Sequence, residues 1–121
     1  MAAEIADKVI YTGFVAPDGT APDPSPSDRW DVVVSAGGGA VGGNLVRAAI
    51  TARKMLPNDL TWCLITGPNL PDAEFDALPR GDNLSLFRFR TDFVHLMAKA
   101  RISISQAGYN TVCDILRTGV R

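Results

Sequence analysis

Glycines that follow an apolar run are the first residues of this sequence whose spacing could do chemistry. Gly37, Gly39 and Gly42 fit the pattern G-x-G-x-x-G within WDVVVSAGGGAVGGNLV, residues 30–46. Glycine lets a backbone approach an anion closely, and the N–H groups at the start of a helix favour negative charge. A glycine loop between a buried strand and a helix therefore predicts a phosphate-bearing ligand.

The same spacing is the fingerprint of dinucleotide-binding domains, so an NAD(P)- or FAD-binding domain of an oxidoreductase is one alternative. That interpretation requires an Asp or Glu at the end of the next strand to bind the ribose hydroxyls. The strand in question, TWCLIT, runs into Gly67 and Pro68 and carries no carboxylate. The Gly-Lys-Ser/Thr of a Walker loop is also absent from the sequence. A tight turn without any ligand is the structural alternative.

A second small turn lies between an expected strand and helix in SISQAGYNTVCDIL, residues 103–116. Thr111 is a good N-cap, which would put Asp114 near the first helical turn. A carboxylate there could accept both hydroxyls of a ribose, or could simply complement the helix dipole. In an open parallel sheet, loops at the carboxyl ends of strands can face one crevice. The two loops together favour a nucleotide, with its diphosphate at one loop and its ribose near the other.

The elements needed to position these loops follow from hydrophobic periodicity and turn residues. Predicted strands are residues 8–15, 30–35, 61–66, 83–89 and 101–105; predicted helices are residues 43–56, 72–78, 91–100 and 111–119. Thr91 or Asp92 is expected to cap the third helix and Gly119 to end the fourth. From residue 30 on, strands alternate with helices over short links, which predicts an α/β, Rossmann-like three-layer sandwich with a mainly parallel sheet.

The chain has 121 residues, of which 46% are hydrophobic and 21% charged, so a packed core is expected. Residues 16–28 are dense in Pro, Asp, Ser and Gly. We therefore expect an interdomain linker at 1–29 and one domain at 30–121. Val120 would begin another strand, which predicts that the domain is incomplete at its C-terminus and cut from a longer protein. An exposed sheet edge there could drive homodimerisation.

Charge and sorting signals narrow the function classes. The net charge is -1 and no Lys or Arg stripe occurs, so nucleic-acid binding has no support. The sequence shows neither a signal peptide nor a run long enough to span a bilayer, which predicts a cytoplasmic protein.

Cys63 and Cys113 are expected to be buried thiols. His95 is the one histidine, and packing on a helix face is favoured over catalysis. Arg88 and Arg90 are more simply a solvated strand end than phosphate ligands.

Two collinear stretches resemble a known family: VVVSAGGGAVGGNLVRAAI, and DNLSLFRFRTDFVHLMAKARISISQAGYNTVCDILRTGV. They are similar to the C-terminal domain of family 28 glycosyltransferases, relatives of the enzyme that adds N-acetylglucosamine to the peptidoglycan lipid precursor. The most specific piece is SQAGYNTVCDIL, close to the family's Ser/Ala-Gly-x-x-Thr-x-x-Glu/Asp. The resemblance covers roughly residues 30–121. It implies the C-terminal, donor half of a GT-B enzyme, in which two Rossmann-like domains face each other across a cleft.

The resemblance also implies which residues bind a nucleotide sugar, usually a UDP-sugar. The glycine loop would lie along the diphosphate, the backbone after the third strand would face the base, the start of the last helix would hold phosphate, and a carboxylate would bind ribose. These residues are Gly37, Gly38 and Gly39; Phe89 and Arg90; Ala107, Gly108 and Thr111; and Asp114. The sequence departs from the family at Gly39, often Ser in the peptidoglycan enzyme, and at Asp114, usually Glu.

For the full-length protein, the resemblance implies metal-independent transfer of a hexosyl group with no cofactor. The catalytic base would belong to an N-terminal half that these residues do not include, so this chain alone is expected to be inactive. The acceptor and the sugar are not assigned, because the family segment that grips the sugar is missing. Peripheral membrane association of the full-length protein is compatible with the family. Some relatives act only with a separate membrane-bound acceptor subunit, so a non-catalytic partner subunit is a further alternative.

Overall fold

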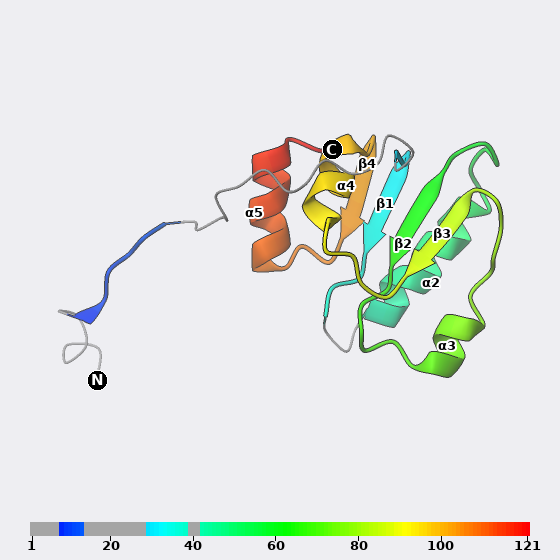
Figure 1. The fold of residues 1–121 in the computed structure, drawn as a ribbon, viewed down its shortest axis with the longest axis horizontal. Helices are drawn as coiled ribbons and strands as arrows, with labels where there is room; N and C mark the ends of the chain where they lie inside the picture. The colour runs from blue at the N-terminus through cyan, green and yellow to red at the C-terminus, as the bar shows by residue number, and fades with distance from the viewer. Residues whose placement is uncertain (1–7, 14–28, 39–41) are drawn as a thin grey trace.

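Four short parallel strands form the sheet in the computed structural model, which describes residues 8–13, 29–38 and 42–121. They are β1 (Val32–Ser35), β2 (Trp62–Ile65), β3 (Leu84–Phe87) and β4 (Ile102–Ser105). The strand order is β3-β2-β1-β4, and each neighbouring pair is parallel and in register (Figure 1). The predicted parallel sheet is confirmed.

Helices follow the strands in the chain, and their bounds are α2 (Gly42–Arg53), α3 (Asp72–Asp76), α4 (Phe93–Lys99) and α5 (Tyr109–Thr118). Because side chains alternate along a strand, the sheet buries two different faces. Val46 and Ala49 of α2 pack with Val32 and Val34 on one face. On the opposite face, Leu96 of α4 packs with Val33, Cys63 and Ile65, and α5 lies against α4. This is the expected α/β three-layer sandwich.

The two central strands carry the core. Val33, Val34, Cys63 and Leu64 are all fully buried. A continuous apolar run suits such a strand, because both of its faces are covered by helices. At the edge strand β3, Leu84 and Leu86 join the cluster under α2, whereas Phe87 packs on the α4 side.

Some predicted boundaries are wrong. The helix predicted over 43–56 ends at Arg53, and the chain continues in short turns in which Lys54 and Met55 donate to carbonyls three residues back. Met55, which falls within the predicted helix, is 82% exposed. Residues 8–13, predicted as part of a strand, form none, because no neighbouring strand pairs with them. The rest of the predicted linker, 1–7 and 14–28, lies outside the described residues.

The last helix also begins earlier than predicted. Gly108 is its N-cap and Tyr109 its first residue, so Thr111 is not the cap and Asp114 lies beyond the first turn. The helix is longer at its N-terminus than predicted, because the Val112 N–H donates to the Gly108 carbonyl at 2.9 Å and so closes the first helical turn. The predicted C-cap is confirmed: Gly119 is left-handed, with φ 68°, and its N–H donates to Ile115.

The order of the strands fixes where a crevice can form. The chain passes from β1 outward to β2 and β3, then returns to place β4 on the other side of β1. After β1 the chain continues to α2 on one face of the sheet, and after β4 it continues to α5 on the other face. A crevice can form between two such loops, at the point where ligands bind in doubly wound folds. After α5 the chain reaches the sheet again, where the Ser103 N–H donates to the Arg121 carbonyl at 2.7 Å.

Candidate functional site

The loops after β1 and β4 converge on one crevice. Gly37 has φ 68°, and a Cβ on it would lie 3.5 Å from Oε1 of Gln106, so the Gln106 side chain lies beside the glycine loop. A cavity of about 300 Å³ opens between the loops. We call it the polar compartment; it is lined by Ser35, Gly37, Gly38, Gln106, Gly108, Tyr109, Asn110 and Thr111.

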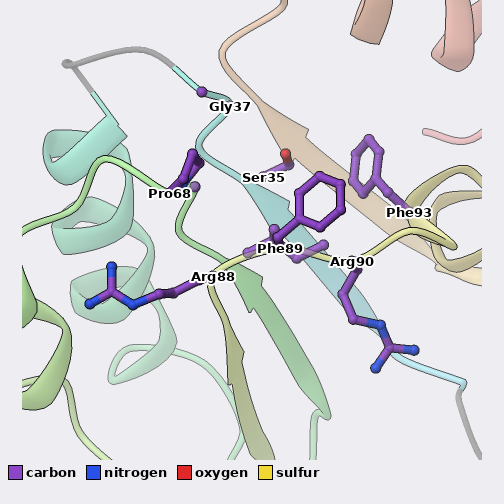
Figure 2. Close-up of a pocket in the computed structure, with 10 residues that line it drawn as sticks. Ser35, Gly37, Pro68, Arg88, Phe89, Arg90 and Phe93 are labelled. Atoms are coloured by element: carbon purple, nitrogen blue, oxygen red, sulfur yellow. The ribbon is translucent and has the colours of Figure 1, made fainter.

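A second cavity of about 260 Å³ lies on the other side of the glycine loop and has a mainly apolar lining (Figure 2). We call it the apolar compartment; it is lined by Ser35, Gly37, Gly38, Ile65, Gly67, Pro68, Arg88, Phe89, Arg90 and Phe93. Both compartments share Ser35, Gly37 and Gly38. The start of the glycine loop therefore borders both of them, in one crevice at the carboxyl ends of the strands.

Phe89 and Phe93 give the apolar compartment its aromatic surface. Phe89 is 70% exposed, although a large apolar side chain of this kind is usually covered. In Figure 2 the rings of Phe89 and Phe93 border the pocket, whereas the side chains of Arg88 and Arg90 extend away from it. The compartment thus presents aromatic carbon rather than guanidinium groups.

The two arginines have structural partners instead. Arg88 donates to the Leu70 carbonyl at 2.7 Å and pairs with Asp72 at 2.5 Å. Arg90 donates from Nε and Nη2 to the two carboxylate oxygens of Asp92, at 2.8 and 2.7 Å. Its guanidinium also lies 4.6 Å from the centroid of the Phe87 ring. Both side chains fasten loops at the rim of the crevice.

Asp92 is the N-cap residue of α4, one of the two predicted, but its pairing with Arg90 replaces the expected side-chain cap. Its side chain makes no capping hydrogen bond. The hydrogen bonds from Arg90 lower the pKa of the Asp92 carboxyl, against the opposing effect of burial. The carboxylate is therefore held as the partner of Arg90, and not of the helix N–H groups.

Gly67 is a site residue that the sequence did not single out. It has φ 80°, and a Cβ on it would lie only 2.0 Å from the Gly37 carbonyl oxygen. The amide of Asn69 donates to the Gly38 carbonyl. The loop between β2 and α3 therefore touches the glycine loop directly. The Gly-Pro pair at 67–68 signalled a turn, but the contact joins segments about 30 residues apart, which local spacing does not reveal.

The third glycine of the motif serves packing. A Cβ on Gly42 would lie 2.9 Å from the Ala36 Cβ and 3.0 Å from the Ala36 carbonyl oxygen. Such close approach of a helix to the preceding strand is the role of the last glycine in the dinucleotide fingerprint. Gly42 therefore positions α2, whereas Gly37 and Gly38 face the crevice.

The start of α5 faces the polar compartment. The first N–H groups of a helix have no intrahelical partners and carry partial positive charge. Gly108, Asn110 and Thr111, at this end of α5, line the compartment. Ala107, just before them, has φ 52°, a conformation that is uncommon for residues other than glycine. Backbone strain of this kind gathers at functional sites.

Most of the predicted site residues are brought together by the fold. Those that line the crevice are Gly37, Gly38, Phe89, Arg90, Gly108 and Thr111. Ala107 and Asp114 are not among the lining residues, and Gly39 lies outside the described residues. Asp114 is half-buried and lies three residues after Thr111, hence on the same face of α5 and one turn further from the compartment. The role of each predicted site residue in binding a ligand stays a prediction.

The remaining candidates lie elsewhere. His95 is half-buried in α4 and lines neither compartment. Cys63 and Cys113 are buried, as predicted, and form no disulfide. In the described part of the chain, no three His, Cys, Asp or Glu side chains are grouped to hold a metal ion. None of the helices described there is both long and apolar enough to cross a bilayer.

A parallel α/β sheet with a crevice at its switch point and a glycine loop in that crevice defines a Rossmann-like class of domain. Comparison with known families gives a match to the glycosyltransferase family 28 C-terminal domain over residues 32–121. The chain therefore belongs to this family.

Solved structures agree on the fold. A crystal structure of the glycotransferase of kitacinnamycin superposes with a TM-score of 0.57 at 18% sequence identity. The similarity covers 89% of this chain but only 27% of that chain, so the present sequence spans about a quarter of the solved glycosyltransferase. At this identity, the likeness supports a shared Rossmann-like fold and says nothing about substrate. Among curated proteins, none matches the chain.

Proposed function

We propose that this chain is the donor-binding domain of a glycosyltransferase, and that its ligand is a nucleotide sugar, most simply a UDP-sugar. The observation that carries the proposal is the convergence of the β1 and β4 loops on one two-part crevice. Membership of the glycosyltransferase family 28 C-terminal domain supports the reaction class.

The chemistry of the two compartments suits the two ends of a nucleoside diphosphate. Phe89 and Phe93 offer aromatic surface for a planar base. The polar compartment offers neutral donors and the positive end of α5 for a diphosphate, with Gln106, Asn110 and Thr111 in its lining. Asp114, one turn further along the same face of α5, is our candidate for binding the ribose hydroxyls.

In the proposed reaction the domain stabilises the leaving group. As the bond between the anomeric carbon and the diphosphate oxygen breaks, negative charge grows on the diphosphate. N–H groups and hydroxyls already aimed at that charge lower the barrier, because they need no reorganisation during the reaction. We propose that a hexosyl group is transferred without a metal ion, and that a second half of the enzyme supplies the acceptor site and the base.

Calorimetric titration tests the proposal. We expect UDP to bind and NAD⁺ not to bind, because the end of β2 provides no carboxylate for the ribose hydroxyls of a dinucleotide. Asp114→Ala should weaken UDP binding about tenfold, the usual effect of losing a hydrogen bond to a charged group, and Asp114→Glu should retain binding.

Asp82→Ala serves as the matched control, since this exposed aspartate precedes β3 at the opposite end of the sheet from the crevice. A protein that binds NAD⁺ but not UDP would contradict the glycosyltransferase proposal and favour an oxidoreductase. An Asp114→Ala protein with unchanged UDP affinity would remove Asp114 from the site and leave the rest of the proposal intact.

A further inference from the structure

Two consecutive carbonyl groups of the glycine loop are turned toward the loop between β2 and α3. A Cβ built on Gly67 would lie 2.0 Å from the Gly37 carbonyl oxygen and 3.2 Å from its carbonyl carbon. The Asn69 side-chain amide donates to the Gly38 carbonyl oxygen. Both carbonyl oxygens therefore face the β2–α3 loop. The Gly37 oxygen lies against the Cα of Gly67, and the Gly38 oxygen accepts a hydrogen bond from the Asn69 amide.

The direction of these carbonyls determines the direction of an N–H group. The described residues contain no cis peptide, and in a trans peptide the carbonyl and the N–H point in opposite directions. The Gly37 carbonyl shares its peptide with the Gly38 N–H, which therefore points away from the β2–α3 loop. Because β2 and β4 flank β1 on opposite sides, this is the direction of the polar compartment.

A loop that binds an anion must keep its carbonyls out of the site, since a carbonyl oxygen repels the same charge that an N–H attracts. We propose that Asn69 is a positioning residue for the nucleotide: its amide holds the Gly38 carbonyl oxygen away from the polar compartment, where that oxygen would repel a diphosphate. This role rests on the proposed function. It contributes preorganisation, which is effective because the donors are aligned before the ligand arrives.

The β2–α3 loop is itself fastened, as a positioning element needs to be. Arg88 donates to the Leu70 carbonyl at 2.7 Å, one residue after Asn69. The Arg88 guanidinium also lies 4.4 Å from the centroid of the Phe75 ring of α3, and Figure 2 shows the side chain extending away from the pocket. The loop is thus tied to the end of β3 and to α3, and Asn69 passes that constraint on to the glycine loop.

The matched pair of variants is Asn69→Ala and Asn83→Ala. Asn83 is also an asparagine whose exposed amide donates to a backbone carbonyl, that of Asn58 at 2.8 Å, but it lies at the other end of the sheet. Asn69→Leu keeps the approximate size and branching of the side chain and removes the donor without adding a charge. All three proteins are titrated with UDP and with inorganic pyrophosphate, and the amide resonance of Gly38 is followed by NMR without ligand.

We expect Asn69→Ala and Asn69→Leu to bind both anions about fivefold to tenfold more weakly than the wild type, the usual effect of losing one hydrogen bond. The Gly38 resonance should shift in both variants. Asn83→Ala should lower the melting temperature by about as much as Asn69→Ala, with unchanged affinity and an unchanged Gly38 resonance.

Unchanged affinity in both Asn69 variants overturns the positioning role, whether or not Gly38 shifts. A wild-type protein that binds neither UDP nor pyrophosphate overturns the proposed function instead. In that case the Gly38 resonance still tests whether Asn69 fixes the glycine loop. An unshifted resonance in both Asn69 variants would show that it does not.

Discussion

Among single residues, three positions around the crevice require glycine, each for a different physical reason. Gly37 and Gly67 both have positive φ, whereas Gly42 is required by the close approach of α2 to Ala36. Gly67 combines both requirements, since a Cβ there would overlap the Gly37 carbonyl. The residue that most restricts the geometry of the glycine loop is thus 30 positions away from it in the sequence.

Gly67→Ala should therefore destabilise the protein by about 1–3 kcal/mol, because the loop must adopt a strained conformation or move. Gly81→Ala is the control: nothing lies within 4 Å of a Cβ at Gly81, and its φ is not in the left-handed range. It should change the stability by less than about 0.5 kcal/mol. Urea denaturation of the two variants measures the difference, and equal midpoints would contradict the close contact between the loops.

At the scale of elements, the starts of three strands are joined by one carboxylate. Asp31 precedes β1, and its Oδ2 accepts the backbone N–H and the hydroxyl of Thr61, both at 2.9 Å. Its Oδ1 lies 3.3 Å from the Arg101 guanidinium, just before β4. These hydrogen bonds, that of the Thr61 N–H first, lower the pKa of Asp31 below 3.8.

A lowered carboxylate pKa sets the sign of the pH dependence. The contribution of Asp31 to stability is present at pH values above the ordinary pKa of an Asp carboxyl, and it is lost as the pH falls through the lower pKa of the folded state. Asp31→Asn should cost about 1 kcal/mol at neutral pH and much less at an acidic pH at which the Asp31 carboxyl is protonated in the folded protein. Urea midpoints at both pH values measure this, with Asp82→Asn as a control that should show no such change. A pH-independent loss would exclude the charge of Asp31 as its cause.

At the scale of the whole molecule, the crevice is a property of the assembled sheet. Its lining comes from the ends of β1, β2, β3 and β4, so no single βα unit contains it. A ligand that bridges these segments binds only the folded protein, and it therefore stabilises the entire domain.

UDP at a concentration 100 times its dissociation constant should raise the free energy of unfolding by about 2.7 kcal/mol. For a domain of this size the melting temperature should rise by roughly 4–8 °C per kcal/mol. A thermal melt with UDP, and one with NAD⁺ at the same concentration, measures the effect. The proposal expects a shift with UDP alone; the absence of a UDP shift at saturating concentration would count against the crevice as a nucleotide site.

Sequence patterns sufficed for the order and type of the elements from residue 30 onward. Apolar runs such as Val32–Ser35 identify strands that are covered on both faces, and Gly119 marks the end of α5. The boundaries were less predictable. Thr111 was expected to cap α5, but Gly108 does so, because N-cap preference is worth only about 1 kcal/mol and the geometry of the β4–α5 loop outweighs it.

Residue patterns alone were enough to predict the parallel α/β architecture, the glycine loop and the family, because strand burial, helix periodicity and glycine spacing are local properties of the chain. The contacts of Gly67 and Asn69 with that loop appear only in the folded structure, as does the direction of the Arg88 and Arg90 side chains. These are contacts between segments brought together by strand order, and their geometry depends on backbone directions that residue types alone do not encode.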